Sequence, residues 1–365
     1  MSNHNFKPIT TLREPMELAS HGLVPVGDLP DLQKVAARYA IAVTPEVAAL
    51  IDPDDPEDPI ARQYIPNVAE LVAQPNEKPD PIGDNVHSPV SGIVHRYPDR
   101  VLFKVVHVCA VYCRFCFRRE MVGPGRATAL SEGTYENALA YIRAKSEIWE
   151  VILTGGDPLM LSPRRLKEIM ADLAAIEHVR IIRIHTRVPV AEPSRITGEM
   201  IAALKVEGAT TWVALHANHV RELTKNARTA CAAIVEAGIP MVSQSVLLRG
   251  VNDDLAALEA LMRGFVECRV KPYYLHHGDL APGTSHLRTT LEQGQNLMRA
   301  LRGHVSGLCQ PDYVVDIPGG HGKAPAGPTY LSPANSLSPE REQASQTRYR
   351  IVDYCGEVHL YPPET

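Results

Sequence analysis

The sequence predicts an α/β protein built on a parallel sheet that curls into a partial (β/α)6 barrel. Six apolar, often β-branched runs of strand length alternate with helix-length segments in the middle of the chain. Strands that are apolar throughout are typical of a parallel sheet covered by helices. Six units are too few for a closed eight-stranded barrel. The expected strands are residues 101–108, 150–154, 179–184, 211–215, 240–246 and 270–275, and the expected helices are residues 131–146, 162–176, 196–207, 220–237 and 253–266.

Two flanking regions complete the predicted organisation around a central barrel at residues 96–290. Residues 1–95 are expected to form an N-terminal arm, helical to about residue 50 and proline-rich after it, because proline disfavours helix at and before its own position. Residues 291–365 are expected to form a C-terminal segment. It begins with a helix near 290–303, continues with a strand at 313–317, and ends in a hairpin at 348–361, where apolar and polar residues alternate around a turn.

Composition limits the classes of function. The chain has 365 residues, 45% of them hydrophobic, and a net charge of −5, so no basic field attracts nucleic acid. No apolar run reaches the length of a membrane span, and the N-terminus lacks the pattern of a secretory signal. Seven cysteines, three of them clustered, do not resemble a disulfide framework. We therefore expect a cytoplasmic protein that binds neither nucleic acid nor a membrane.

Three cysteines with the spacing Cys-x3-Cys-x2-Cys follow the first predicted strand directly. They are Cys109, Cys113 and Cys116. Three thiolates can hold three irons of a [4Fe–4S] cluster, which leaves the fourth iron open to another ligand, whereas ferredoxin-type clusters use four cysteines. A closed zinc site is the alternative, but it needs four ligands and no second Cys/His pair follows at a suitable distance. Since chemistry in parallel barrels occurs at the carboxyl ends of the strands, these cysteines are expected there.

Other polar or glycine-rich positions also stand at strand ends. Gly155, Gly156 and Asp157 end the second strand, and glycines allow the backbone to approach a ligand closely. His216 ends the fourth strand and Gln244 lies near the end of the fifth. A simple strand-to-helix turn, or a polar side chain satisfied within the core, would explain each position alone. Their shared location favours a binding site.

Lys323 follows a stretch rich in proline and glycine. A Walker phosphate-binding loop would require Gly at position 317 and Ser or Thr at 324, but the sequence has Ile317 and Ala324. A lysine amine in a dry site can lose its proton and react with an aldehyde, which is the chemistry that pyridoxal 5′-phosphate (PLP) requires. A solvated surface lysine is the alternative.

Together these motifs resemble those of a known family. The cysteine spacing is similar to that of radical S-adenosylmethionine (SAM) enzymes, in which the open iron binds SAM and its cleavage yields a radical that abstracts hydrogen. The similarity extends from about residue 40 to the end and resembles the lysine 2,3-aminomutase family. The segments that carry it are residues 95–100, 245–252, 272–275, 279–280, 286–289 and 316–323.

The resemblance implies three cofactors: a [4Fe–4S] cluster bound by the three cysteines, SAM bound beside the glycine motif, and PLP. Lys323 would hold PLP covalently. Tyr97 would pack beside its ring and Arg100 would pair with its phosphate. His216 and Gln244 would lie among the groups around SAM and PLP.

The resemblance also implies an isomerase that moves the α-amino group of L-lysine to the β-carbon. Arg118 would bind the substrate carboxylate, which suits a guanidinium, and Asp279 and Asp316 would bind the distant ammonium. Two carboxylates facing a pocket repel one another unless a cation neutralises them, which favours a cationic substrate. Arginine, ornithine, glutamate, or a lysine destined for a translation factor are alternative substrates. A radical enzyme without PLP and a non-enzymatic iron–sulfur protein are alternative functions.

Three positions depart from well-studied relatives. Asp254 stands where those relatives have a zinc-binding cysteine, so we predict no zinc. Phe115 replaces a histidine inside the cysteine loop, and His321 interrupts an unbroken glycine run. The family resemblance further implies a homo-oligomer and a reductant such as flavodoxin or ferredoxin, while the loss of the zinc ligand leaves the usual assembly open.

Overall fold

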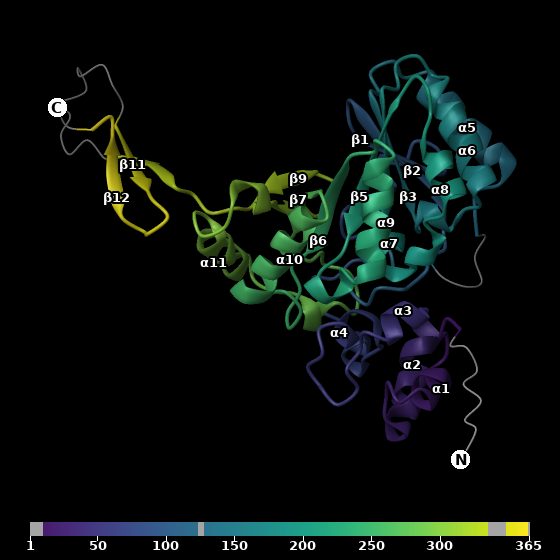
Figure 1. Cartoon of the computed structure of the whole chain (residues 1–365), viewed down its shortest axis with the longest axis horizontal. Coiled ribbons are helices and arrows are strands. Elements are labelled where there is room, and N and C mark those ends of the chain that lie inside the picture. Colours follow the sequence, from purple (N-terminus) through teal and green to yellow (C-terminus); the bar gives the residue numbers. More distant parts are fainter. Residues whose placement is uncertain (1–9, 123–127, 335–347, 364–365) are drawn as a thin grey trace.

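A computed structural model of the chain describes residues 10–122, 128–334 and 348–363 (Figure 1). Its centre is a nine-stranded sheet whose strands follow one another in chain order. Strands β2 to β8 are parallel to their neighbours, and β1 and β9 pair antiparallel at the two edges. The strands are β1 Ile93–Tyr97, β2 Arg100–Val106, β3 Glu150–Gly155, β4 Ile181–Thr186, β5 Thr210–His216, β6 Met241–Val246, β7 Val270–His276, β8 Asp312–Asp316 and β9 Lys323–Pro325.

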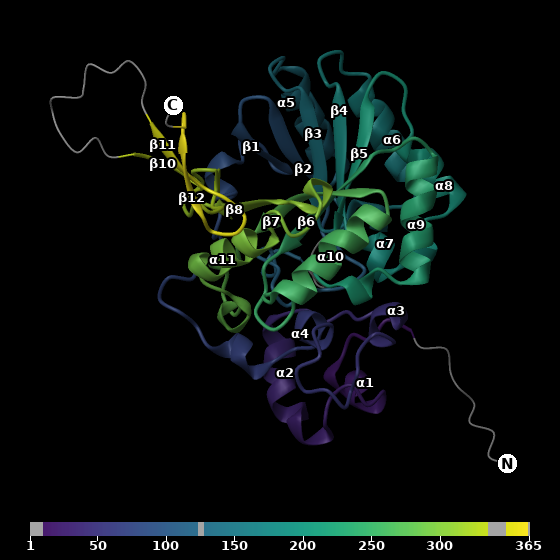
Figure 2. The same ribbon diagram turned by 60° about the vertical axis from the view of Figure 1, so that its left-hand side comes forward.

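Helices cover the outer face of this sheet and follow its strands (Figure 2). They are α5 Glu132–Arg143, α6 Pro163–Ala174, α7 Val188–Ala191, α8 Gly198–Leu204, α9 Lys225–Glu236, α10 Leu255–Glu267 and α11 Leu291–Leu301. Six of them begin at a side chain that accepts a hydrogen bond from a free backbone N–H, which is the usual N-cap. The capping residues are Ser131, Ser162, Thr197, Thr224, Asp254 and Thr290. The predicted alternation of strands and helices is therefore confirmed.

Alternate residues of a barrel strand lie on opposite faces of the sheet, one packed under the helices and one facing the cavity. In β4, Ile182 and Ile184 are fully buried, while Arg183 and His185 line a cavity inside the curled sheet. Successive side chains of a strand point to opposite faces, so an apolar set can pack under the helices while a polar set faces inward. Residues from both edges of the sheet line the same cavity, from Tyr97 in β1 to Lys323 in β9. The sheet thus closes around the cavity as an incomplete barrel, as predicted.

The N-terminal arm packs at one end of this barrel in both views (Figures 1 and 2). Its helices are short: α1 Pro15–Ser20, α2 Leu29–Arg38, α3 Pro45–Ala48 and α4 Ala61–Tyr64. The backbone of the cysteine loop hydrogen-bonds to the arm, because Tyr112 N–H donates to Ala42 and Arg114 N–H donates to Gln63. The arm therefore covers the end of the barrel at which the cysteines lie.

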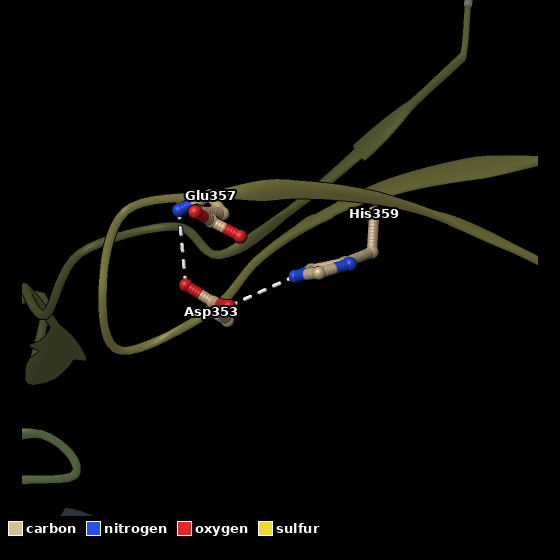
Figure 3. Close-up of side chains that lie close together, drawn as sticks. All are labelled: Asp353, Glu357 and His359. Atoms are coloured by element: carbon tan, nitrogen blue, oxygen red, sulfur yellow. Dashed lines mark hydrogen bonds and ion pairs between the residues drawn. The ribbon is translucent and has the colours of Figure 1, made fainter.

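A small antiparallel sheet projects beyond the barrel at the C-terminal end (Figure 1). It contains β10 Leu331–Pro333, β11 Tyr349–Val352 and β12 Val358–Tyr361. Asp353 closes the turn between β11 and β12: its carboxylate accepts from the N–H groups of Cys355 and Glu357 at 2.9 Å and pairs with His359 at 2.8 Å (Figure 3). The predicted hairpin is confirmed, and β10 adds a third strand to it.

Two differences from the prediction have physical reasons. The helix expected from residue 220 begins at Lys225, because Thr224 caps it and Glu222 folds back onto the N–H groups of Asn218 and His219. The sheet also has more strands than the six units expected, since β1, β8 and β9 extend it at both sides. In the described part of the chain, no helix has the length and apolar character needed to cross a membrane.

Candidate active site

All the residues that the sequence suggested for a site line one cavity inside the barrel. Most stand at or just beyond the carboxyl ends of the strands, where parallel barrels place their chemistry. These residues are Tyr97, Arg100, Cys109, Cys113, Cys116, Arg118, Gly155, Gly156, Asp157, His216, Gln244, Asp279, Asp316 and Lys323. The cysteine triplet and the lysine thus face the same space, although more than 200 residues separate them in the chain.

The cysteine loop is held from behind by buried ion pairs. Arg114, which lies between two of the cysteines, is 1% exposed and its Nε donates to Glu70 of the arm at 2.9 Å. Arg119 also pairs with Glu70, and its guanidinium stacks 3.6 Å from the ring centre of Tyr39. Glu70 itself is fully buried. The loop therefore has a fixed backbone, with its sulfurs turned to the cavity.

The three thiols are favoured as thiolates only when a metal cluster binds them. Each is free, and desolvation followed by the charge of Cys113 raises the pKa of Cys116 to about 11. Desolvation and the nearby Asp157 likewise raise the pKa of Cys109 well above its ordinary value. Without a cation, three thiolates at this place would repel one another, whereas bound iron stabilises the deprotonated form.

Two glycines let the end of β3 lie against the cysteine loop. Gly155 has a φ of +113°, and a Cβ built on it would stand 2.3 Å from the carbonyl oxygen of Val106. A Cβ on Gly156 would stand 2.2 Å from the carbonyl oxygen of Val108. No other residue fits this approach. The backbone of the glycine motif is therefore presented to the cavity beside the cysteines.

Asp157 has a structural task in the same motif. Its carboxylate accepts hydrogen bonds from Thr186 Oγ1 at 2.8 Å, Arg187 N–H at 2.7 Å and Leu159 N–H at 3.0 Å. These bonds tie the end of β3 to the end of β4. Asp157 lines the cavity, and both oxygens of its side chain accept hydrogen bonds from protein donors, so its role in binding a cofactor stays a prediction.

His216 and Gln244 lie on neighbouring strands of the cavity wall. The Nε2 atom of His216 is buried and has no hydrogen-bond partner in the described residues, which marks it as a group open to a ligand. The ring of Phe115 lies 5.6 Å from that of His216, so Phe115 fills space at the same wall. Gln244 Nε2 lies 3.2 Å from His185 Nε2.

The lysine loop is fixed by Tyr97. The backbone N–H of Lys323 donates to Tyr97 Oη at 2.7 Å, and Lys323 Nζ lies 2.8 Å from Asp316. Arg100 stacks 4.0 Å above the Tyr97 ring and pairs with Asp99 at 2.7 Å. An amine, an aromatic ring and a guanidinium thus lie together in the cavity that the cysteines also line.

Arg118 forms an ion pair with Asp84, a residue that the sequence analysis did not identify. Its Nε and Nη2 donate to one oxygen of Asp84, at 3.1 and 2.8 Å, and Asp84 also accepts from Arg96 at 3.2 Å. Asp84 is 2% exposed. A substrate carboxylate would therefore replace or share this partner.

The two predicted aspartates are in different states. Desolvation and the charge of Asp316 raise the pKa of Asp279 to about 7, and Asp279 forms no ion pair in the part of the chain that is described. For Asp316 desolvation would raise the pKa, but the hydrogen bond to His276 and the charge of Lys323 outweigh it and hold the pKa below its ordinary value. The two carboxyl groups therefore have shifted pKa values of opposite sign, which favours ionised Asp316 and protonation of Asp279 below about pH 7.

Several polar side chains in or beside the wall were not identified from the sequence. His185 and His276 stand at the ends of β4 and β7, the same signal that identified His216, so strand-end position alone could have found them. Arg183 and Arg187 lie in or just after β4. Asp84 comes from the irregular arm, where no periodicity indicates which way a side chain points.

Comparisons with known proteins agree with this geometry. The family model described as "Radical SAM superfamily" matches residues 103–261, and that described as "Lysine-2,3-aminomutase" matches residues 298–341. An L-lysine 2,3-aminomutase from Clostridium subterminale is 43% identical over 80% of this chain and 70% of its own. One from Acetoanaerobium sticklandii is 41% identical over 81% of this chain and 71% of its own. A glutamate 2,3-aminomutase from Clostridioides difficile is 38% identical over 82% and 70%.

The cofactors of these relatives fit the cavity. Three free thiols offer ligands for iron, and the glycine cradle and the unpartnered Nε2 of His216 leave room and a polar atom for SAM. The Lys323 amine, beside Tyr97, is a fitting attachment for PLP. The chain belongs to the lysine 2,3-aminomutase family, radical SAM isomerases that use a [4Fe–4S] cluster, SAM and PLP.

Proposed function

We propose that this protein moves the α-amino group of L-lysine to its β-carbon. Sequence identity alone does not choose the substrate, since lysine and glutamate enzymes are both similar to the chain. The observation that carries the choice is the pair Asp279 and Asp316 in the same cavity as Lys323. The ammonium group at the far end of a lysine side chain would neutralise the negative charge of these carboxylates.

The balance of charge at this wall supports a cationic substrate. Asp84 pairs with Arg96 and Arg118, and Asp316 pairs with Lys323 and, at 3.7 Å, with Arg96. Once its Nζ is bonded to the cofactor, Lys323 no longer supplies an ammonium to Asp316, which then shares Arg96 with Asp84. Together with Asp279, three carboxylates then face two guanidinium groups, and the unmatched negative charge is costly in a desolvated cavity. The side-chain ammonium of lysine would remove that cost, whereas the carboxylate of glutamate would increase it.

The other residues take roles from their positions. We assign Cys109, Cys113 and Cys116 to the cluster, and the backbone of Gly155 and Gly156 with His216 and Gln244 to SAM. When bound, the cluster and SAM would supply hydrogen-atom abstraction, and PLP would supply a conjugated system over which an unpaired electron can spread. The chain would orient the reactants and exclude water from them. The N-terminal arm, which covers the end of the barrel, would contribute to the exclusion of water.

In the same cavity, Lys323 is assigned to PLP, Tyr97 to the face of its ring and Arg100 to its phosphate. Arg118 would bind the substrate carboxylate in two-donor geometry, as it now binds Asp84. The substrate carboxylate would then compete with Asp84, so Asp84 would limit how tightly carboxylates bind.

The proposed partners follow from the chemistry of the cluster. A small electron-transfer protein such as flavodoxin or ferredoxin would reduce the cluster, and the cytoplasm would keep the cluster and the seven free cysteines reduced.

We further propose a homo-oligomer, because the three-stranded C-terminal sheet exposes large apolar residues such as Val358 and Tyr361, whose exposed fractions are 58% and 61%.

The test is anaerobic reconstitution with iron, sulfide, PLP, SAM and a reductant, followed by amino acid analysis with lysine, arginine and glutamate in parallel. We expect a β-amino acid from lysine, and loss of that product in Asp279→Asn. Asp312→Asn is the matched control, because Asp312 is exposed at the far end of the strand that carries Asp316. Product from glutamate but not from lysine would refute the assignment.

A further inference from the structure

Arg187 lies in the cluster wall, and the proposed function leaves it without a role. It follows β4, is 6% exposed, and its Nη1 lies 3.3 Å from the sulfur of Cys113. This distance is within the range of a hydrogen bond to sulfur. A guanidinium thus carries its positive charge against one of the three sulfurs assigned to the cluster.

A second group fixes the orientation of this guanidinium. Nη2 of Arg187 donates to Glu222 at 2.6 Å and to Gln63 of the arm at 2.8 Å. Glu222 in turn accepts from the N–H groups of Asn218 and His219 and from the hydroxyl of Tyr64. The arginine therefore has one fixed direction, with Nη1 turned to the sulfur.

We propose that Arg187 is a positioning residue that raises the reduction potential of the [4Fe–4S] cluster through Cys113, and that Glu222 limits the effect. Reduction adds an electron to the cluster, and a nearby positive charge stabilises the added electron in low-dielectric surroundings. Hydrogen bonds to the cluster sulfurs tune its potential in the same direction. The proposal rests on the assignment of the three cysteines to a cluster.

The network makes two predictions of opposite sign. Replacing Arg187 removes a positive charge, so the cluster becomes harder to reduce. Replacing Glu222 removes the negative charge that compensates Arg187, so the cluster becomes easier to reduce. A purely structural role would not separate the variants in this way, because both would lose iron and shift in the same direction.

The experiment is a potentiometric titration of the anaerobically reconstituted protein, monitored by the electron paramagnetic resonance of the reduced cluster. In Arg187→Gln we expect the ratio of reduced to oxidised cluster at a fixed potential to fall at least tenfold, which is 59 mV for one electron. In Glu222→Gln the potential rises. Arg187→Lys keeps the charge and is expected to shift the potential less than Arg187→Gln does.

Arg183→Gln is the matched control. Arg183 lies in β4, four residues before Arg187, and lines the same cavity, but its Nε pairs with Glu150 at 3.0 Å. Its removal should leave the potential unchanged. Iron content is measured in every variant, so a variant that cannot hold the cluster is recognised, and Arg187→Lys then carries the comparison with wild type.

A rival role is binding of the SAM carboxylate, because Nε of Arg187 is buried without a hydrogen-bond partner among the described residues. Weaker SAM binding in Arg187→Gln with full iron and an unchanged potential would overturn our proposal in favour of that role. The titration uses no amino acid, so a wrong substrate assignment does not affect it. Failure of the wild-type protein to assemble any cluster would instead refute the proposed function.

Discussion

Asp279, which we propose binds the substrate ammonium, is also a carboxyl group that destabilises the folded chain when it is ionised. It lines the cavity without an ion pair among the described residues, and desolvation and the charge of Asp316 raise its pKa to about 7. An ionised carboxylate there is unfavourable until a cation arrives. The affinity for a cationic substrate and the instability of the empty site thus have the same cause.

The sign of this effect predicts a stability that depends on pH. The carboxyl of an unfolded chain ionises near pH 3.8, and that of folded Asp279 near 7. Between these values the folded state binds more protons, so the free energy of unfolding falls as pH rises and the loss is complete above about pH 7. Each pKa unit corresponds to about 1.4 kcal/mol, and solvent in the cavity reduces the total, so we expect a loss of about 2–4 kcal/mol.

Asp279→Asn cannot ionise and avoids this loss. We expect the variant to be more stable than wild type at pH 8 and equally stable near pH 4, although it would bind lysine poorly. Urea unfolding at both pH values measures the difference. Asp312→Asn, at an exposed position, should change stability by less than about 0.5 kcal/mol at either pH. A variant that gains nothing at pH 8 would show that Asp279 is not perturbed.

Elements that are irregular in sequence hold the site in place. The cysteine loop and the arm are joined by Glu70, whose carboxylate pairs with both Arg114 and Arg119. Desolvation would raise the pKa of Glu70, but the two arginines outweigh it and lower the pKa. This pairing links a strand-end loop to a segment about 40 residues earlier.

Breaking this link should destabilise the loop strongly. Glu70→Gln leaves two arginines in the interior without their counter-charge, and removing one partner of a buried ion pair typically costs about 3–5 kcal/mol. We expect a lower urea midpoint and faster release of iron. Asp31→Asn removes an exposed ion pair with Lys34, in the same arm, and should cost about 0–1 kcal/mol. Equal effects of the two variants would contradict the role of Glu70.

The glycine cradle offers a second test at the scale of elements. Gly155→Ala would place a Cβ against the carbonyl oxygen of Val106 and force a φ of +113° on alanine. Such backbone strain costs about 1–3 kcal/mol, and the clash adds to it. Gly133→Ala in α5 meets no atom within 4 Å and should instead stabilise by about 0.4–1 kcal/mol. Chemical denaturation compares the two variants directly, and similar stabilities would show that the close approach is unimportant.

The regular elements were predictable because their signals are local. Apolar runs and the helix-length segments between them predicted the barrel strands and their helices to within a few residues, and strand-end position indicated His216 and Gln244. The partners of Arg118 and Arg187 were not predictable. Asp84 and Gln63 come from the arm, and Glu222 from a turn that interrupts an expected helix. Tertiary packing alone brings them to the cavity.

At the scale of the whole molecule, the arm and the C-terminal sheet differ in how they are supported. The arm contributes to the main apolar core through residues such as Leu12, Leu18 and Ile60. The C-terminal sheet projects from the barrel, and all four residues of β12 are exposed. A small sheet is marginally stable unless a hydrophobic face is covered. This contrast supports a second copy of the chain as the cover.

The β12 residues therefore predict the oligomeric state. Val358 and Leu360 of β12 lie on one face of the C-terminal sheet. Tyr361 lies on the other face, as does Leu331 of β10, which pairs with Ile351 of the central strand. We expect the wild-type protein to sediment as an oligomer, and Val358→Lys/Leu360→Lys or Leu331→Lys/Tyr361→Lys to sediment as a monomer, because lysine opposes burial of the face that it occupies. Val26→Lys, an isolated exposed position on the arm at 72%, is the control and should leave the oligomer intact. Because the cysteine loop is supported by the arm, the monomeric variants should still take up iron. A monomeric wild type, or oligomers in both double variants, would mean that the exposed sheet has another partner.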